Sequence, residues 1–400
     1  MEFVVRAWSA QARLGSLHLG ATGPQLETPC LLLLTRKGLP AFIPPDLFHK
    51  LHPDALALQV SPLHFLDSPP PEVVAEVGGL HKMLCLPEHG LVAVGRDSIM
   101  DEADGEGTTK LGASFKTSFG RRIVGPVKYM EVINACKPNL WASLPDEVPA
   151  WVSEKRNRMS VGRTLQWLDH CLSLSTDMGC LGVVVGGSSV EQRTHSAQQT
   201  ATRNVAGFSL GGFGLGEAAE DRGPLLEAVT ASLPMEKPRH VSGLGMPEEV
   251  LQAVAAGVDL FDSTYPHMLT MGGYAMTFPA TMEDILGGFA NKNLAVEEWS
   301  KSDSDSAKIC LRSVSFRLDE SPLVDGCKCY TCRKHSRAYI HHLLNTHEML
   351  AQTLLDIHNM YHYLGFFQAI REAIRANDFP VFHNQFISHR RQSTLLLSSQ

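Results

Sequence analysis

The chain has 400 residues and 44% of them are hydrophobic, which is enough apolar material for a large folded core and excludes a disordered protein. Lys and Arg number 35 against 42 Asp and Glu, so the net charge is -7. Proteins that bind nucleic acid unaided usually carry a basic surface, and this balance therefore argues against such a function for the chain alone.

The first residues predict a β-hairpin that leads into the fold. Residues 1–8 lack the charged and then apolar pattern of a secretory signal, although Arg6 and Arg13 leave a transit peptide as the alternative. No apolar run reaches membrane-spanning length. The nine cysteines are an odd number without a disulfide framework, which fits a reducing compartment, and we expect a cytoplasmic protein.

Short apolar runs and helical stretches alternate along the first two-thirds of the chain. The apolar runs cover residues 30–34, 55–60, 91–94, 140–144, 181–185, 207–210, 241–244 and 258–261. Such continuous runs are typical of strands buried on both faces. Helical spacing lies between several of them, at residues 71–77, 129–136, 161–174, 192–203, 225–233 and 248–256. The alternation predicts an α/β fold, a (β/α)₈ TIM barrel over residues 1–299, with a doubly wound open sheet as the alternative.

Two polar segments interrupt this pattern. The stretch from residue 97 to 122 contains an acidic run at 101–106, and we interpret it as a long solvated loop. Residues 300–306 are mostly Ser, Asp and Lys, and they are expected to separate the barrel from a second region. That region, residues 300–400, is predicted to hold a zinc-binding subdomain and long C-terminal helices packed on the barrel. Apolar residues recur at helical steps from 334 to 376, as in a long helix or a helix pair.

Three thiols lie on one tight turn of the second region. Cys327, Cys329 and Cys332 follow Gly326 within a polar loop. Thiolates are soft ligands, and zinc takes four ligands in a tetrahedron, so this spacing predicts one Zn²⁺ ion. Chance clustering and redox chemistry are the alternatives. The other cysteines are expected to be isolated buried thiols: Cys30, Cys85, Cys136, Cys171, Cys180 and Cys310.

The fourth zinc ligand must come from elsewhere in the chain. The candidates are Cys310, His335, His341, His342, His347, His358 and His362. His358 is favoured because it shares the apolar stripe of Leu354 and Ile357, which turns its ring inward. Four protein ligands leave no open position, so the metal is expected to be structural, clamping the turn to the helix.

The zinc motif and several ordered segments resemble the tRNA-guanine transglycosylases. Cys-x-Cys-x-x-Cys with a downstream histidine resembles the zinc signature of this family. The other similar segments are Gly-Gly-Leu-His-Lys at 78–82, Leu-Pro-Asp-Glu at 144–147, the glycine-rich stretch 207–217 and Gly-Val-Asp-Leu-Phe-Asp at 257–262. The resemblance runs from about Arg13 to His358. It implies a (β/α)₈ barrel with a zinc subdomain, which exchanges a guanine in tRNA for a queuine-type base and dimerises through the zinc region.

The resemblance also implies roles for particular residues. Asp262 aligns with the nucleophilic aspartate, and its position at the end of the eighth apolar run places it at the barrel mouth. Asp146 is expected to accept hydrogen bonds from a purine, while Gly211 and Gly212 let the backbone approach a flat base. Asp262 as a helix cap and Asp146 as an ordinary turn residue are the alternatives. The glycine run 211–216 also imitates a dinucleotide loop, but no acidic residue follows at the expected strand.

Three departures from the family pattern point away from catalysis. Val94 lies about where the family has a catalytic aspartate, whose loss lowers a rate by roughly 10²–10⁴-fold. Val185 precedes Gly186 where the family has a base-binding glutamine. Residues 266–269 read Pro-His-Met-Leu where the family has an arginine that holds RNA.

These departures are similar to those of the family's non-catalytic accessory subunits, which pair with a catalytic homologue. The resemblance therefore implies a heterodimer acting on the wobble position of tRNA in queuosine biosynthesis, with peripheral attachment to the mitochondrial outer membrane. An active transglycosylase that uses Asp262 together with Asp97 is one alternative. A zinc barrel that hydrolyses another N-glycosidic bond is a second.

Overall fold

A computed structural model describes residues 1–20, 23–66, 68–99, 105–117, 120–176, 179–286 and 307–398, with side chains as far as residue 390. Two compact units divide the chain. The first comprises Met1–Ala7, Gln11–Pro40 and Leu56–Asp262, and the second comprises Trp8–Ala10, Ala41–Ala55 and Ser263–Gln400. The proposed boundary between 299 and 300 and the polar segment 300–306 lie outside the described residues.

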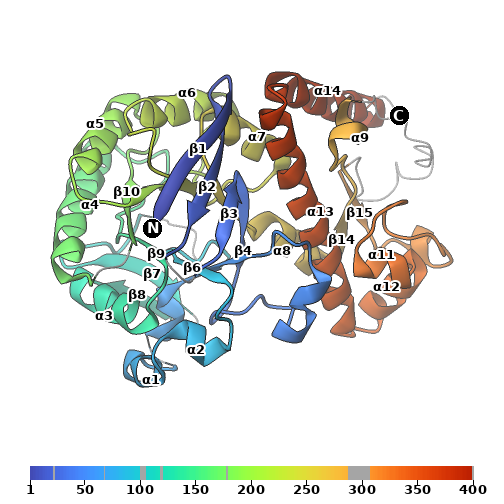
Figure 1. Ribbon diagram of the computed structural model, residues 1–400, viewed down its shortest axis with the longest axis horizontal. Helices are drawn as coiled ribbons and strands as arrows, with labels where there is room; N and C mark the ends of the chain where they lie inside the picture. Colours follow the sequence, from blue (N-terminus) through green and yellow to red (C-terminus); the bar gives the residue numbers. More distant parts are fainter. Residues whose placement is uncertain are drawn as a thin grey trace. The chain divides into compact units, whose positions relative to one another are not determined.

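The first unit is built on a closed barrel of eight parallel strands (Figure 1). Their order around the barrel is β10-β11-β12-β13-β4-β5-β6-β9. The strands are β4 (Cys30–Leu34), β5 (Ala57–Val60), β6 (Gly90–Ala93), β9 (Leu140–Ala142), β10 (Gly179–Val184), β11 (Gly207–Leu210), β12 (Arg239–Val241) and β13 (Leu260–Asp262). Each predicted apolar run contains or overlaps one of them. The (β/α)₈ prediction is confirmed, and closure of the sheet excludes the doubly wound alternative.

Helices fill most of the connections between the barrel strands. They are α1 (Pro71–Val77), α2 (Leu80–Leu84), α3 (Pro126–Cys136), α4 (Glu154–Leu174), α5 (Val190–Ala201), α6 (Ala219–Thr230) and α7 (Pro247–Ala255), with the 3₁₀ helix η2 (Pro62–Phe65) before α1. Their starts follow from the sequence. Ser153 caps α4 by accepting from Arg156 N, Ser189 caps α5 by accepting from Gln192 N, and Pro247 begins α7.

Two small antiparallel sheets join the barrel in this unit. The predicted N-terminal hairpin is present as β1 (Glu2–Ser9) and β2 (Ala12–His18), extended by β3 (Gln25–Thr28). The interpretation of residues 97–122 as loop throughout is wrong, because β7 (Ala113–Thr117) and β8 (Gly120–Val124) form a hairpin there. Phe115 in β7 and Ile123 in β8 each alternate with polar residues. Both alternating runs are too short to predict strands within the polar stretch around them. Acidic residues 101–104 lie outside the described part of the chain.

A buried ion pair ties the N-terminal sheet to the barrel. Arg13 and Asp259 are both fully buried, and the guanidinium contacts both carboxylate oxygens. Asp259 also accepts from Arg239 N at 2.7 Å, while Arg13 donates to the carbonyls of Met235 and Lys237. Every charge is therefore met by an opposite charge or a hydrogen bond, which a buried pair requires.

The second unit is mainly helical. Its elements are η1 (Pro45–Lys50), α8 (Thr264–Gly272), β14 (Tyr274–Met276), α9 (Met282–Leu286), β15 (Lys308–Cys310), η3 (Val314–Phe316), α11 (Tyr330–Lys334), α12 (Arg337–Asn345), α13 (Leu350–Arg375) and α14 (Phe379–Ser398). The helical pattern from 334 to 376 is thus a pair, α12 and α13, and α14 follows it. Phe278 and Phe366 are central to an aromatic cluster that joins α13 to α14 through Phe386.

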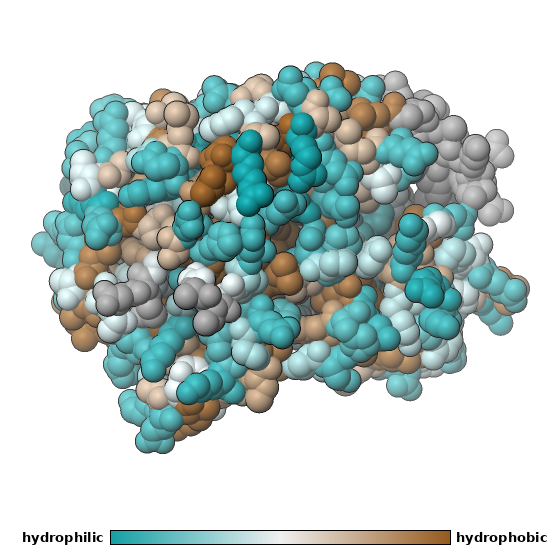
Figure 2. Space-filling view, in the orientation of Figure 1, coloured by the Kyte–Doolittle hydropathy of each residue, from teal (hydrophilic) through white to brown (hydrophobic). Residues whose placement is uncertain are grey.

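The surface is mixed in polarity. On the face that carries β1, hydrophobic and hydrophilic side chains of the described residues are interspersed (Figure 2). None of the helices in the described ranges combines the length and the apolar content that a membrane crossing needs.

Candidate functional site

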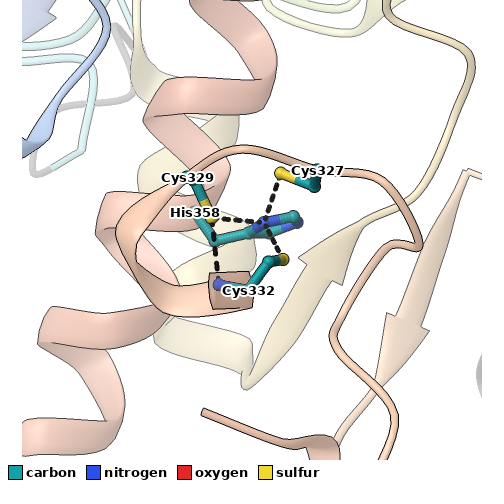
Figure 3. A group of neighbouring side chains, drawn as sticks. All are labelled: Cys327, Cys329, Cys332 and His358. Carbon is teal, nitrogen blue, oxygen red and sulfur yellow. Dashed lines mark hydrogen bonds between the residues drawn. The ribbon is translucent and has the colours of Figure 1, made fainter. Parts of the chain in front are cut away.

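The three clustered thiols and His358 meet in the second unit (Figure 3). Their ligand atoms all lie within 4.8 Å of one another. Cys327 follows Gly326, whose positive φ of 76° makes the turn, and Cys329 is the N-cap of α11. His358 comes from the buried face of α13. A tight turn, the short helix α11 that follows it and the long helix α13 therefore supply the four side chains.

The distances within this group suit a tetrahedral metal ion. His358 Nδ1 lies 3.9 Å from Cys327 Sγ, 3.5 Å from Cys329 Sγ and 3.4 Å from Cys332 Sγ. Zinc bonds to sulfur and nitrogen at tetrahedral angles put these atoms about 3.6 Å apart. Three thiols and an imidazole in this arrangement are thus a donor set that can hold a metal ion.

Neighbouring groups favour the metal-binding forms of His358 and Cys327. His358 Nε2 lies 2.9 Å from the carbonyl of Met276, so it donates its proton there and Nδ1 keeps its lone pair for a metal. Hydrogen bonds with Cys329 and Cys332 lower the pKa of the Cys327 thiol. The thiolate is the metal-binding form, so both effects favour ligation.

Other candidate ligands have different partners. His341 Nδ1 lies 2.8 Å from the carbonyl of Leu311, and His362 Nε2 lies 2.7 Å from that of Phe278. His335 stacks on Tyr339. Among the described residues, the structure groups only His358 with the three thiols.

The remaining cysteines are mostly inert. Burial raises the pKa of Cys136 to about 12 and that of Cys171 to about 11, which keeps both thiols protonated. The expectation that all six would be buried is wrong for Cys85, which is exposed after α2, and for Cys310, which is half-buried in β15. The sequence does not indicate whether a cysteine at the end of a short helix, such as Cys85 after α2, is buried or exposed.

Asp262 lies at the mouth of the barrel, at the carboxyl end of β13. It is 1% exposed, and its Oδ2 accepts hydrogen bonds from Gly243 N at 3.2 Å and from Ser98 Oγ at 3.4 Å. Ser263, not Asp262, occupies the N-cap position of α8. The carboxylate is thus held by loops that follow β12 and β6.

Asp146 follows β9 but its carboxylate is engaged within the unit. Arg156 binds both of its oxygens at 2.7 and 2.8 Å, and Arg163 adds a contact at 3.2 Å. Both arginines come from α4, and Asp146 is 1% exposed. Two cations on one buried carboxylate leave it poorly suited to recognise a base.

Gly211 and Gly212 lie in the loop after β11, where two side chains hold their backbone. Glu147 Oε1 accepts from Gly212 N at 2.7 Å. Arg193 is fully buried and donates to the carbonyls of Gly211 and Gly212, with its guanidinium 3.8 Å from the ring of Phe213. A Cβ at Gly211 would lie 3.0 Å from Glu147 Oε1, which explains the glycine.

The positions that depart from the family are apolar or displaced. Val94 and Val185 are buried members of the apolar core cluster of the barrel. Asp97 is 5% exposed, and its Oδ2 lies 2.7 Å from His64 Nε2. The carboxylate closest to Val94 along the sequence is therefore paired with a histidine of η2.

The sequence did not indicate four arginines that contact the loops at the barrel mouth. Arg96, Arg156, Arg163 and Arg193 all contact backbone or carboxylate groups of the loops that follow the strands. Their order in the chain carries no signal for these contacts. The partners of Arg96 and Arg193 lie after other strands, and those of Arg156 and Arg163 depend on how α4 packs beside the loop after β9.

Comparison with known proteins agrees with this geometry. The family model described as Queuine tRNA-ribosyltransferase matches residues 9–392. Three similar proteins are each named Queuine tRNA-ribosyltransferase accessory subunit 2. The protein from Xenopus tropicalis is 38% identical over 91% of this chain and 94% of its own length. The human protein is 37% identical over the same shares, and that from Danio rerio is 38% identical over 95% and 97%. The chain therefore belongs to the queuine tRNA-ribosyltransferase family.

Proposed function

We propose that this chain is the non-catalytic accessory subunit of a heterodimeric queuine tRNA-ribosyltransferase. The barrel mouth carries the argument. Asp262 is kept, but Val94 and Val185 stand in the core where an acid and an amide are needed. Without a general acid or base, proton transfer to the leaving base loses roughly 10²–10⁴-fold in rate. The names of the similar proteins support the same function.

The reaction that this subunit supports requires a carboxylate that attacks the ribose carbon while guanine leaves. The incoming nucleobase then displaces the carboxylate from the covalent intermediate. In this chain the Asp146 carboxylate is bound by two arginines, so it does not offer free acceptors to a purine. The catalytic homologue would supply these groups, and this chain would help to position the tRNA.

We also propose that Cys327, Cys329, Cys332 and His358 hold one structural Zn²⁺ ion. The donor set and the spacing of the four ligand atoms support zinc, whose shell they would fill. A closed shell stabilises the turn against α13 and leaves no site for substrate.

The zinc region and α13 are our proposed interface with the catalytic subunit. Exposed apolar side chains lie on this unit, among them Val314, Leu318 and Met349, which are 75%, 86% and 82% exposed. Burial of these side chains by a partner would remove apolar surface from water. Attachment to the mitochondrial outer membrane remains a prediction from the resemblance.

The test is incorporation of labelled queuine into tRNA by the purified chain alone, by the catalytic homologue alone, and by the mixture. We expect full activity only in the mixture, and the same activity when the chain carries Asp262→Ala. Incorporation by the chain alone that Asp262→Ala abolishes would make it an enzyme in its own right.

A further inference from the structure

One arginine crosses the mouth of the barrel. Arg96 follows β6 and its side chain is 6% exposed. Its Nη1 lies 3.5 Å from the carbonyl of Phe213, in the loop after β11, and 4.0 Å from Glu147 Oε1, in the loop after β9. The same atom is 3.6 Å from where a Cβ on Gly243 would stand, in the loop after β12.

The reach of this side chain follows from the strand order. β6 and β12 lie directly opposite each other in the closed barrel. A side chain that starts after one strand and comes close to the loop after the opposite strand extends across the mouth. Barrels of this type bind their ligands at this end, between the loops that follow the strands. A buried guanidinium therefore lies among the loops at the end where such barrels bind their ligands.

The chemistry of the guanidinium matches that of a guanine edge. Guanine contains a guanidine unit, in which N1–H and the 2-amino group present N–H donors side by side in one plane. The Arg96 guanidinium presents the same kind of donors. Its Nη1 lies beside acceptors that include the Glu147 carboxylate and the Phe213 carbonyl. These acceptors flank Gly212, whose N–H is also bound by Glu147.

We propose that Arg96 is a built-in substitute for the base, which fills the mouth and excludes free guanine-type bases from this subunit. The inference rests on the proposed function, since it concerns the base that the complex exchanges. It adds a direct consequence: the accessory subunit does not compete with its catalytic partner for free base.

Equilibrium dialysis with radiolabelled guanine tests this assignment on the full chain. We expect no measurable binding by the wild type. Arg96→Ala removes the side chain beside Glu147 and opens the mouth, so binding should be stronger than in the wild type by roughly tenfold or more. Arg158→Ala, which removes an exposed arginine of α4, should bind as little as the wild type.

A competition experiment distinguishes an Arg96 guanidinium that mimics the base from a side chain that only fills space. Millimolar guanidinium ion should displace guanine from Arg96→Ala and raise its melting temperature, whereas an equal concentration of potassium chloride should do neither. If the alanine variant does not fold, Arg96→Gln is used, and its uncharged amide should still admit guanine, more weakly.

Three results would overturn the proposal: guanine binding by the wild type equal to that of Arg96→Ala, a folded Arg96 variant that binds no guanine, or guanine binding that guanidinium leaves unchanged. Each can occur whether or not the chain activates the catalytic homologue. Failure of this inference is therefore distinguishable from failure of the proposed function.

Discussion

At the scale of single residues, Cys329 is the most buried thiol of the metal group, with 0% exposure. Cys329→Ser replaces a soft thiolate by a hydroxyl that does not deprotonate near neutral pH. We expect the zinc content of the purified protein, measured by plasma mass spectrometry, to fall from about one ion per chain to nearly none. The same variant should fail to co-purify with the catalytic homologue.

Cys85→Ser is the matched control for this variant, because Cys85 is exposed and outside the cluster. It should keep its zinc and its partner. Pairing that survives complete loss of zinc would separate the metal from the interface and refute the proposed interface.

The free energy of unfolding of the barrel is expected to depend on pH through His240. Burial lowers its pKa from 6.5 to about 4, although nearby Asp262 acts in the opposite direction. The unfolded chain binds this proton below pH 6.5 and the folded chain only near pH 4, so the free energy of unfolding falls as the pH drops through this window. The loss attributable to His240 is up to about 3 kcal/mol.

His240→Gln should therefore flatten this part of the pH profile. Denaturant unfolding of wild type and variant across the same window measures the difference. Any effect of acid on a bound metal ion would be common to both proteins and would cancel. Parallel pH profiles for the two proteins would mean that His240 is not buried in its neutral form.

At the scale of elements, the packing of α13 against α14 depends on aromatic side chains. Phe366 is fully buried, and its ring centre lies 5.2 Å from that of Phe278 and 5.3 Å from that of Phe386. Phe366→Ala should lower the free energy of unfolding by about 3–5 kcal/mol, through lost burial and a cavity. Val381→Ala on α14 is the control, because Val381 is 50% exposed and should cost little.

Chemical denaturation followed by circular dichroism measures this difference. Equal costs for the two variants would show that α14 is not held by this cluster. The α13 pattern was evident in the sequence, since its apolar residues recur at helical steps. The side chains that contact this apolar face were not evident in the sequence, because Phe278 and Phe386 are separated from Phe366 along the chain.

At the scale of the whole molecule, the two compact units should respond differently to loss of metal. The metal group lies entirely in the second unit, where it joins α11 to α13. Chelation should therefore speed amide hydrogen exchange in α11, α12 and the middle of α13. The barrel strands β10 to β13 should keep their protection, because their hydrogen bonds lie within the first unit.

Hydrogen exchange measured by mass spectrometry, before and after chelation and again after zinc is restored, tests this prediction. Faster exchange throughout both units would mean that the metal stabilises the entire chain as one cooperative body.

The sequence by itself predicted the barrel and the cluster of three thiols, and it favoured His358 among the candidates for the fourth ligand. Strands buried on both faces need continuous apolar runs, and clustered thiols have few uses besides metal, so these signals are local. Even His358 could be selected, because the apolar stripe of its own helix shows which way it faces.

Only the tertiary structure decided the state of the barrel mouth. The sequence showed Asp146, Asp262 and the glycines as candidate binding residues, but not that Arg156 and Arg163 bind Asp146. Nor did it show that Arg96 reaches across to the loops of other strands. The Arg96 contact joins residues 117 positions apart in the chain. The two contacts of Asp146 depend on how α4 packs beside the loop after β9. Strand order and loop geometry decide such partners, and local periodicity does not contain them.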